Sequence, residues 1–435
     1  MNATETLDPA SAEERRIMSK MARRLLPILV VMFLIAFIDR QNVGFAKLQM
    51  VHSLGMTEAA FGLASSLFFI GYLLFEVPST LALHRYGARV WLARIMLTWG
   101  LITVLMGFTT SMPVFCSLRF LLGIAEAGFY PGVIYYLTLW FPQSYRAKVL
   151  GIFTLGSALA NMLGSLVGGV LLSLNGVWGL AGWQWVFVAT GVPAVVVALV
   201  VFRVLPASFR DARFLDAREK QIVAAALERE KPAQAEHAQP WKALLDPRVM
   251  LFAATYMLMS TSLYGVTYWL PTLVKSFGVS SSTNGLLSML PWALAVLLLW
   301  LPSKLRRAGS ILRTIAIVAA LGALGFLLSL VLPSTPLRFV ALVLGGACIP
   351  LLYPCFWSMP PRYFTGARAA ASVAAINSIG NLGGFFSQNL MPFAGKVTGT
   401  AFGPMIVPIV CLALLGTGAL VAWTRAERRM VAAQA

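Results

Sequence analysis

Charge is scarce in this chain. Asp, Glu, Lys and Arg make up 11% of its 435 residues, whereas soluble globular domains carry about 25%. Hydrophobic residues make up 59%, and many of them occur in runs long enough to cross a bilayer. This composition excludes an ordinary soluble domain and predicts an all-α polytopic membrane protein.

Clusters of chemically reactive side chains are also scarce. The chain has only 3 His and 4 Cys, with no CxxC spacing and no group of metal-ligating residues. It has no GxxxxGK[ST] phosphate-binding motif, no His, Asp and Glu cluster at a membrane face, and no Ser–His pair that could meet. We therefore expect no metal, no cofactor and no enzymatic activity. Active transport would have to draw on an ion gradient, unless another subunit supplied ATP hydrolysis.

Twelve apolar runs of about 20 residues predict twelve transmembrane helices. The first run is too long for the hydrophobic region of a signal peptide and no small-residue cleavage site follows it, so we expect it to remain as the first helix. The runs lie near residues 25–45, 58–80, 90–108, 113–135, 147–172, 182–204, 248–271, 284–302, 312–332, 338–358, 370–391 and 403–423.

The positive charge, a net +18, is unevenly distributed along the chain. Of the 34 Lys and Arg residues, four lie in one set of alternating loops and two lie inside runs, which leaves 28 in the other set and the termini. The positive-inside rule assigns these 28 to the cytoplasm, together with both termini. The charge thus sets the topology and implies no nucleic-acid partner. The four are Lys47, Lys275, Arg338 and Lys396, and the two are Arg40 and Arg119.

A charged segment divides the runs into two sets of six. It contains a pattern typical of a short amphipathic helix at 214–230 and then becomes rich in Pro, Gln and Ala. We interpret it as a cytoplasmic linker between two pseudo-symmetric six-helix bundles. The predicted organisation is a cytoplasmic segment at 1–24, a bundle at 25–204, the linker at 205–247, a bundle at 248–424 and a cytoplasmic tail at 425–435.

Five ionisable residues lie away from the edges of the runs, all in the first half of the chain. A charge at the bilayer centre costs at least ~2.5–3.5 kcal/mol on the insertion scale, so such residues generally mark a functional site. The runs of the second half carry Tyr, Trp, Asn and Gln in their interiors instead. The five ionisable residues are Asp39, Arg40, Glu76, Arg119 and Glu126.

Three of these residues are candidates for proton exchange. We expect Asp39 and Arg119 at similar depth, which predicts an ion pair that protonation of Asp39 would release, leaving Arg119 to bind an anion. Glu126 shares a helix face with Arg119, two turns away, and burial disfavours a charged carboxylate, so Glu126 could exchange a proton. The alternative is a set of static ion pairs. Arg40 points about 100° away from Asp39 and is a candidate anion-binding group.

Two features near the ends of runs are candidate gates. Glu76, in "FEVPS", is predicted to pair with loop arginines and to latch one conformational state. The segment "LHRYGARVWLAR" contains Arg85, Gly87 and Arg89. It could form a gate between the second and third helices, or serve only as a topology signal.

Aromatic and amide side chains are candidate ligand contacts. Asn377 and Asn381 are four residues apart on one face of the eleventh run, where they could bind a ligand or hold neighbouring helices together. Trp357 could face a ligand or lipid. Tyr72 and Tyr264 could contact a ligand or simply pack between helices.

Several segments resemble the anion:cation symporter branch of the major facilitator superfamily, which includes galactonate, glucarate, tartrate, phthalate and 4-hydroxyphenylacetate permeases and the vesicular glutamate transporters. The resemblance covers about residues 23–424. It implies two six-helix bundles around a central cavity, alternating access and, in bacterial members, proton-driven uptake of organic acids. The segments are "FIDRQNVGFA", "GYLLFEVPS", "RYGARVWLAR", "LRFLLGIAEAGFYPGVIYYLTLWFP" and "INSIGNLGG".

The resemblance also implies roles for matching residues. In galactonate-type members a Tyr commonly stands two residues before the Asp of the first helix, where this chain has Phe37, and this chain has no Gln inside the fifth run. These departures favour a smaller or more aromatic carboxylate over a polyhydroxylated sugar acid. The implied proton relay is Asp39, Arg119 and Glu126, and the implied substrate contacts are Arg40, Tyr72, Trp357 and Asn377.

We therefore expect a proton-coupled symporter that imports a small organic carboxylate, a hydroxy acid or an aromatic acid. The resemblance places it in the lipid bilayer of a bacterial inner membrane as a monomer. An exporter or anion exchanger on the same fold is an alternative, which counterflow in vesicles would distinguish. A transporter-like sensor is another, but it would need a larger cytoplasmic domain than the linker offers.

Overall fold

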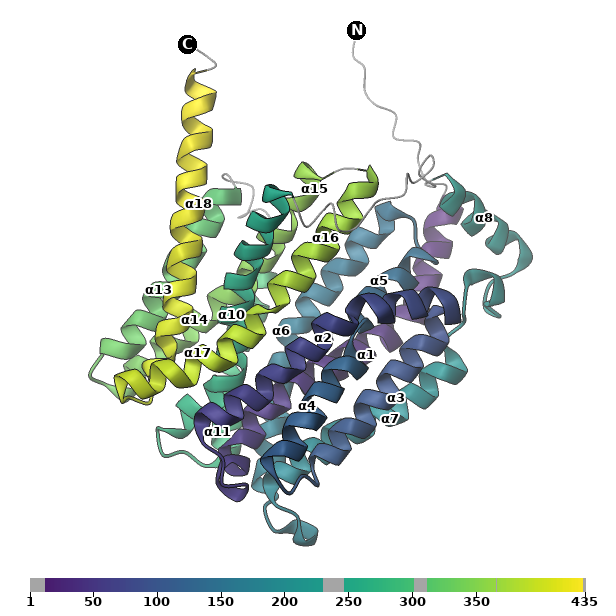
Figure 1. Ribbon diagram of the computed structural model, residues 1–435. Helices are drawn as coiled ribbons and strands as arrows, with labels where there is room; N and C mark the ends of the chain where they lie inside the picture. Colours follow the sequence, from purple (N-terminus) through teal and green to yellow (C-terminus); the bar gives the residue numbers. More distant parts are fainter. Residues whose placement is uncertain (1–11, 230–245, 301–310, 365, 433–435) are drawn as a thin grey trace.

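The computed structural model describes residues 12–229, 246–300, 311–364 and 366–432, and these residues form helices joined by short connections, without strands (Figure 1). The predicted all-α fold is confirmed. Most of the second half of the predicted linker, 230–245, lies outside the described residues.

We call the helices before the linker the N-terminal half. Helix α1 packs against α6 and α7, α3 packs against α7, and α2 packs against α4. A 3-10 turn, η1, precedes α7. The bounds are α1 Ala12–Ser53, α2 Glu58–Tyr86, α3 Ala88–Met106, α4 Met112–Glu126, α5 Phe129–Thr138, α6 Gln143–Ser173, η1 Val177–Gly179 and α7 Gly182–Val204.

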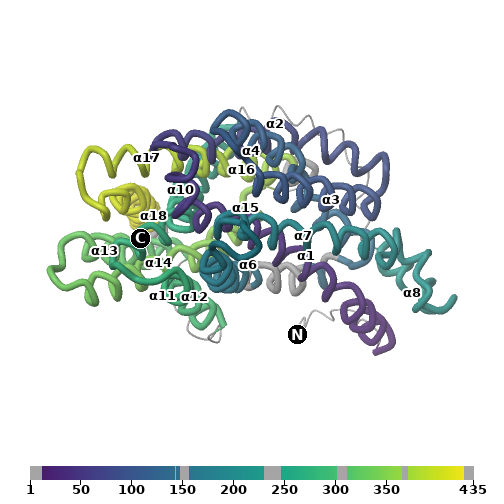
Figure 2. Tube along the Cα trace, turned by 90° about the horizontal axis from the view of Figure 1, so that it is seen from below, coloured from purple at the N-terminus to yellow at the C-terminus, as the bar shows by residue number. Residues whose placement is uncertain are grey.

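The C-terminal half comprises the helices after the linker. Helix α13 packs against α14 and α18, and α10 packs against α16, α17 and α18. The two halves lie side by side in Figure 2, with α2 and α6 facing the C-terminal helices. The bounds are α10 Pro247–Lys275, α11 Ser281–Ser288, α12 Leu290–Trp300, α13 Ile311–Val331, α14 Thr335–Trp357, α15 Pro360–Tyr363, α16 Gly366–Asn381, α17 Gly383–Thr398, η4 Gly403–Met405 and α18 Ile406–Ala432.

The predicted amphipathic linker helix is present as α8, Ala217–Glu228, after a short turn, η2, at Phe209–Asp211. Its first turn is capped by Asp216, whose side chain accepts a hydrogen bond from the backbone N–H of Glu219. Glu219 also forms a 2.8 Å ion pair with Lys20 near the start of α1. We call the end of the molecule where α8 meets α1 the linker end, uppermost in Figure 1, and the opposite end the far end.

Eleven helical segments of the described residues are long and apolar enough to span a membrane. The remaining predicted run, 370–391, corresponds to α16 and α17, which are separated at Leu382. Gly383 follows this break, and a Cβ atom there would clash with the carbonyl oxygen of Met257 on α10. The remaining predicted helix is thus present as two helical pieces, α16 and α17. Gly383, at the start of the second piece, allows it to lie close to α10.

A second break separates α4 from α5. Gly128 has a φ of 81°, which favours glycine, and a Cβ atom there would clash with the hydroxyl oxygen of Ser79 on α2. The Ser79 hydroxyl donates a 2.6 Å hydrogen bond to the Ala127 carbonyl, which the break leaves without a helical partner. Glu126 therefore sits at the last turn of α4.

The two halves close against each other at the far end. Gly44 of α1 lies against Tyr268 of α10, since a Cβ atom at Gly44 would be 2.9 Å from the Tyr268 carbonyl oxygen. Gly169 of α6 and Gly285 of α11 are equally close, since a Cβ at Gly169 would be 2.6 Å from the Cα of Gly285. Side chains larger than glycine would hold the backbones apart, so these glycines permit the close contact.

A lysine also bridges the halves at the far end. Lys47 is 2% exposed and forms a 2.5 Å ion pair with Glu58 at the start of α2. Its Nζ atom lies 3.2 Å from the ring centroid of Trp269 on α10, a cation–π contact. The ion pair stays within the N-terminal half, whereas the ring contact joins the halves.

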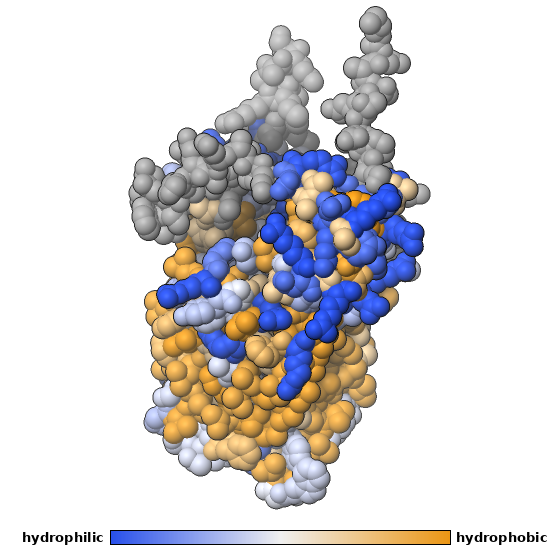
Figure 3. Space-filling view, turned by 90° about the vertical axis from the view of Figure 1, so that its right-hand side faces the viewer, coloured by the Kyte–Doolittle hydropathy of each residue, from blue (hydrophilic) through white to orange (hydrophobic). Residues whose placement is uncertain are grey.

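The surface matches a membrane environment. Figure 3 shows a broad apolar surface below a hydrophilic cap at the linker end. Exposed apolar side chains occur on helices of both halves, for example Leu101, Val196, Leu321 and Leu414. Burying such a surface in lipid rather than water is favourable.

Candidate substrate cavity and charge network

A cavity of about 750 Å³ lies between the two halves. It is lined by the stretches of the helices nearer the linker end, while the far end is closed by the glycine contacts described above. Among the described residues no group of His, Cys, Asp or Glu could hold a metal ion. The cavity is lined by all six residues predicted as substrate contacts and by Glu76. These six are Arg40, Tyr72, Tyr264, Trp357, Asn377 and Asn381.

Arg40 is the cation of this cavity wall. Its Nε atom donates a 2.5 Å hydrogen bond to the carboxylate of Glu126, with which it forms an ion pair, and its Nη1 atom donates to the Tyr264 hydroxyl at 3.4 Å. Its Cζ atom lies 5.3 Å from the ring centroid of Tyr72 and 5.5 Å from that of Phe37. Aromatic rings and one carboxylate thus hold the guanidinium at the cavity surface, where its side chain is 13% exposed.

Glu126 lies behind Arg40. Its side chain is 2% exposed, and its Oε2 atom is buried without a hydrogen-bond partner. Among the described residues, Arg40 is the only cation that forms an ion pair with this carboxylate. A proton on Glu126 would therefore remove the main attraction that holds Arg40 in place.

Asp39 faces away from the cavity into the N-terminal half. It is 2% exposed and accepts hydrogen bonds from Asn42 and Thr103, each at 3.1 Å. Asn42 also donates to Thr190 on α7 at 2.9 Å. The acid is thus satisfied by neutral donors within one half.

The predicted ion pair between Asp39 and Arg119 is absent from the described residues. Arg119 is 1% exposed, donates to the Ser65 carbonyl at 3.3 Å and lies 5.0 Å from the Phe68 ring centroid. It still interacts electrostatically with both Asp39 and Glu126. The prediction from membrane depth that Asp39 and Arg119 lie in the same region is correct. The side chain of Arg119, however, points toward Ser65 on α2 and not toward Asp39.

The predicted partners of Glu76 are also wrong. Instead of loop arginines, Glu76 binds two residues of α16 in the other half: Asn377 donates to it at 3.2 Å and Ser378 at 2.5 Å. Glu76 is 6% exposed and lines the cavity. It lies too deep along α2 for the loop, because the helix continues for almost three turns beyond it, to Tyr86.

The predicted gate segment forms the tight connection between α2 and α3. Gly87 has a φ of 83° and its N–H donates to the Leu83 carbonyl at 3.0 Å, so a glycine conformation turns the chain. Arg85 is exposed and its Cζ lies 5.6 Å from the Tyr86 ring centroid. Arg89 lies 6.0 Å from the Phe202 ring centroid on α7. In this conformation the two arginines contact aromatic rings of the same half.

Aromatic rings line the C-terminal side of the cavity. The Tyr256 ring packs 5.1 Å from Trp357 and 5.8 Å from Tyr353, centroid to centroid. Tyr256 and Tyr353 were not among the predicted substrate contacts, although Pro350 and Pro354 beside Tyr353 could have indicated an irregular helix there. These rings and prolines of α10 and α14 present a mainly apolar wall to the cavity.

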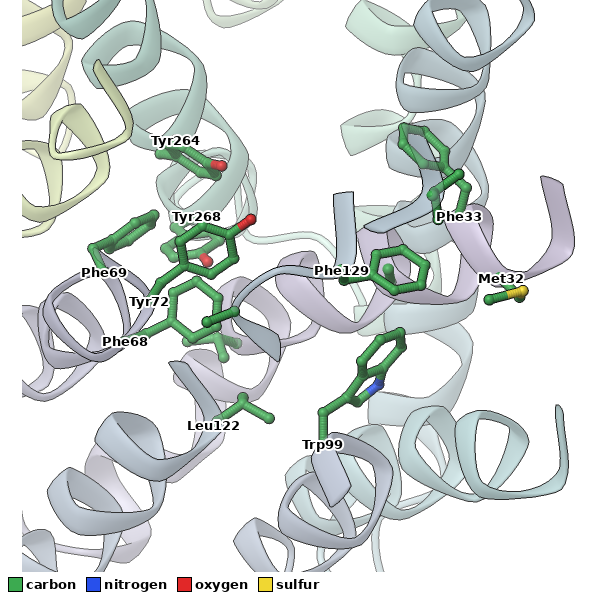
Figure 4. Close-up of a cluster of buried hydrophobic side chains, with 14 of the residues drawn as sticks. Met32, Phe33, Phe68, Phe69, Tyr72, Trp99, Leu122, Phe129, Tyr264 and Tyr268 are labelled. Atoms are coloured by element: carbon green, nitrogen blue, oxygen red, sulfur yellow. The ribbon is translucent and has the colours of Figure 1, made fainter. Parts of the chain in front are cut away.

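A further aromatic cluster joins α2 to α10 beside the cavity, which two of its rings, Tyr72 and Tyr264, line (Figure 4). The Phe69 ring lies 4.8 Å from that of Tyr264, and Phe68 lies 5.2 Å from Phe69 and 6.0 Å from Tyr72. Figure 4 shows the rings of Tyr72 and Tyr264 in one group with Phe68, Phe69 and Tyr268. The cluster explains why both tyrosines are buried while still lining the cavity.

Two helical bundles with buried charge in one half and a shared cavity are the architecture of a transporter, and comparison with known proteins identifies which kind. The Major Facilitator Superfamily profile matches residues 29–388. The chain belongs to this superfamily. The resemblance indicated by the sequence motifs is thereby confirmed.

The relatives of the chain include bacterial transporters. It is 42% identical to a "Quinolone resistance transporter" of Acinetobacter baumannii, over 92% of this chain and 93% of that protein. It is 39% identical to a "Putative tartrate transporter" of Agrobacterium vitis, over 90% of each. A crystal structure of a bacterial homologue of the human lysosomal transporter Spinster, inward-facing and unoccupied, shares the fold, with a TM-score of 0.71 and 17% identity, over 93% and 97% of the two chains.

These findings define the protein as a multi-pass membrane transporter of the bacterial major facilitator type, with a small-molecule substrate, and not an enzyme. The prediction of a transporter without enzymatic activity is confirmed.

Proposed function

We propose that this protein is a proton-coupled symporter that imports a small organic carboxylate by alternating access. The observation that carries the proposal is the ion pair of Arg40 and Glu126 at the wall of the cavity. The protein would act as a monomer in a bacterial inner membrane, with the linker end and both termini in the cytoplasm, as the excess of Lys and Arg in that set of segments favours. The conformation with a closed far end would then be inward-facing.

The coupling step follows from competition for one cation. While Glu126 is charged, its carboxylate forms an ion pair with Arg40, so a substrate carboxylate would have to displace Glu126 to bind Arg40. A proton on Glu126 neutralises that carboxyl and leaves the guanidinium, which offers five N–H donors in a planar fork, to the substrate. Proton and anion therefore favour each other's binding, and thermodynamic linkage makes this coupling reciprocal.

Asp39 and Arg119 would supply a second proton site. Both interact electrostatically with the Arg40–Glu126 region, although neither lines the cavity. An anion that enters against a negative-inside potential is opposed by ~2.3 kcal/mol per charge per 100 mV. Two protons for each monoanion would reverse this electrical opposition, and two buried acids are present. In this role Arg119 tunes the acids and does not bind substrate.

Arg40 also connects binding to movement of the halves. Its contact with Tyr264 crosses from α1 to α10, as do the far-end contacts of Gly44 and Lys47. A substrate held by Arg40 against the aromatic wall would bring the linker-end halves together. The inter-bundle bonds of Glu76 with α16, and the turn at Arg85, Gly87 and Arg89, would move with this closure and act as gates.

The lining favours an aromatic or short carboxylate. Tyr72, Tyr264 and Trp357 offer ring faces, while Asn377 and Asn381 offer amides at a single side of the cavity. A polyhydroxylated acid would leave several hydroxyls against apolar rings, at a cost of roughly 1–3 kcal/mol for each unsatisfied group.

Export or anion exchange is the alternative function. It is favoured by the relative named as a quinolone resistance transporter, with which the chain shares 42% identity. The same charge pair would serve either direction, because net flux follows the gradients. Counterflow distinguishes them: an exchanger moves labelled substrate only when unlabelled substrate is present on the opposite side.

The test uses purified protein in liposomes that contain a pH-sensitive dye. Tartrate, phthalate, 4-hydroxyphenylacetate and galactonate are added outside, to wild type, Asp39→Asn and Glu126→Gln. The matched control is Glu219→Gln, a change of the same kind on the linker helix, where Gln can still complete the capping box. We expect acidification with at least one acid, lost in the first two variants and retained in the control. Substrate binding by wild type without proton movement would contradict the proposal.

A further inference from the structure

The cavity carries a carboxylate that an anion carrier does not need. Glu76 lines the cavity, and among the described residues it has no cation within ion-pair distance. Its two donors, Asn377 and Ser378, are neutral and bind one oxygen each. A substrate carrying only negative charge would be repelled by this group, so its place at the wall requires another reason.

Arg40 and Glu76 both lie near one aromatic ring, that of Tyr72. Tyr72 and Glu76 are four residues apart on α2, so their side chains share a face about 6 Å apart. The guanidinium of Arg40 lies 5.3 Å from the Tyr72 ring centroid. The cavity wall therefore presents a cation, an aromatic ring and a carboxylate near one another. The rings of Tyr256 and Trp357 line the same cavity from the other half.

We propose that the cavity is built for a zwitterionic aromatic substrate, with its carboxylate on Arg40 and a protonated amine on Glu76. The inference rests on the proposed function, in which Arg40 receives the carboxylate. A carboxylate has about four lone-pair sites, and the bonds from Asn377 and Ser378 use two of them. The remaining sites suit an ammonium group, which forms charge-assisted bonds stronger than those of a hydroxyl.

The charges of the loaded cavity then balance. With Glu126 protonated, the wall carries one positive group, Arg40, and one negative group, Glu76. A zwitterion matches both and carries no net charge itself. Its entry is therefore not opposed by the membrane potential, and a single proton on Glu126 would make uptake electrically favourable.

A competing role for Glu76 is purely structural, because it joins α2 to α16 across the halves. The two roles predict different effects of Glu76→Gln. Loss of a structural contact would alter the binding of every ligand by a similar factor. Loss of an ammonium partner would weaken only ligands that carry an amine.

The experiment measures binding by titration calorimetry, using the purified full-length protein and three ligands of nearly the same shape: 4-(aminomethyl)benzoate, 4-(hydroxymethyl)benzoate and 4-methylbenzoate. Wild type should bind the amine about tenfold or more tightly than the methyl compound, which corresponds to about 1.4 kcal/mol. Glu76→Gln should abolish that preference while 4-methylbenzoate still binds, which also shows an intact fold. Glu219→Gln is the control and should keep the preference.

Every other outcome contradicts either the zwitterion site or the proposed function. Equal affinity of wild type for the amine and the methyl compound, or an equal loss for all ligands in Glu76→Gln, overturns the zwitterion site. Binding and proton-coupled uptake of tartrate alone overturns it too, but leaves the proposed symport intact. Failure of every carboxylate to bind wild type overturns the proposed function itself.

Discussion

Arg40 of α1 and Glu126 of α4 form a 2.5 Å ion pair that faces the cavity on one side and the buried interior of the N-terminal half on the other. The pair depends on the break after α4, because Gly128 turns the chain immediately beyond Glu126. An ion pair so placed can be opened by a proton from one direction or by an anion from the other.

Glu126→Gln should uncouple substrate binding from pH. In wild type we expect carboxylate affinity to fall as pH rises, by up to about tenfold per unit above the range in which Glu126 titrates, because the deprotonated acid reclaims Arg40. In the variant Arg40 is permanently free, so affinity should be nearly the same at about pH 5.5 and about pH 8. Calorimetric titration at both pH values measures this. A variant that retained the wild-type pH dependence would show that another group controls Arg40.

Arg40→Lys should retain the positive charge but lose much of the affinity. Lysine cannot form the two parallel bonds by which a guanidinium binds a carboxylate, and a lost charge-assisted bond is worth about 1.5–3 kcal/mol, or about 10- to 150-fold. The loss should appear in ligand binding, measured by calorimetry, with little change in thermal stability because Lys can still neutralise Glu126. Arg338→Lys is the control, since Arg338 lies outside the cavity lining. Wild-type affinity in Arg40→Lys would exclude Arg40 as the anchor.

The sequence predicted much of this site but not its pairings. Apolar runs and helix depth placed Asp39, Arg40, Arg119 and Glu126 in one region, and all six predicted substrate contacts line one cavity. Depth fixes a position along a helix axis, but it does not fix where a long side chain turns. The sequence therefore could not show that Arg119 donates its hydrogen bond to the Ser65 carbonyl and not to Asp39.

The partners of Glu76 illustrate a second limit. They come from α16, about 300 residues away in the chain, and only the packing of the two halves brings Asn377 and Ser378 to it. The broken helices show a third limit. Glycines at 128 and 383 were visible in the sequence, but the close neighbours that make them necessary, Ser79 and Met257, were not.

Gly128→Ala should destabilise the protein and impair transport. A left-handed conformation costs a non-glycine residue about 1–2 kcal/mol, and here the added Cβ would also clash with the Ser79 hydroxyl. Gly278→Ala is a matched control, because Gly278 has a φ of 76° and a Cβ added there would meet no atom within 4 Å. Thermal unfolding in detergent should show a clearly larger loss for the first variant. Equal losses would mean that the contact with Ser79 is unimportant and that only the backbone conformation matters.

The far-end closure should depend on Trp269. Lys47 and Glu58 belong to the same half, so their ion pair can persist when the far end opens. The contact of Lys47 with Trp269 joins the two halves and must break on opening. A cation–π contact is worth about 0.5–2 kcal/mol, so Trp269→Leu should shift the population toward the far-end-open state by about 2- to 30-fold.

The shift can be measured by labelling a buried reporter from outside. Thr267 is 5% exposed at the contact of α10 with Gly44, so Thr267→Cys, in a protein whose four native cysteines are replaced by alanine, should react with an impermeant maleimide only when the far end opens. Trp269→Leu should raise the labelling rate, whereas Glu58→Gln should change it little, because that ion pair does not cross the interface. If Glu58→Gln raised labelling as much as Trp269→Leu, closure would depend on the charge balance of Lys47 rather than on its contact with the opposite half.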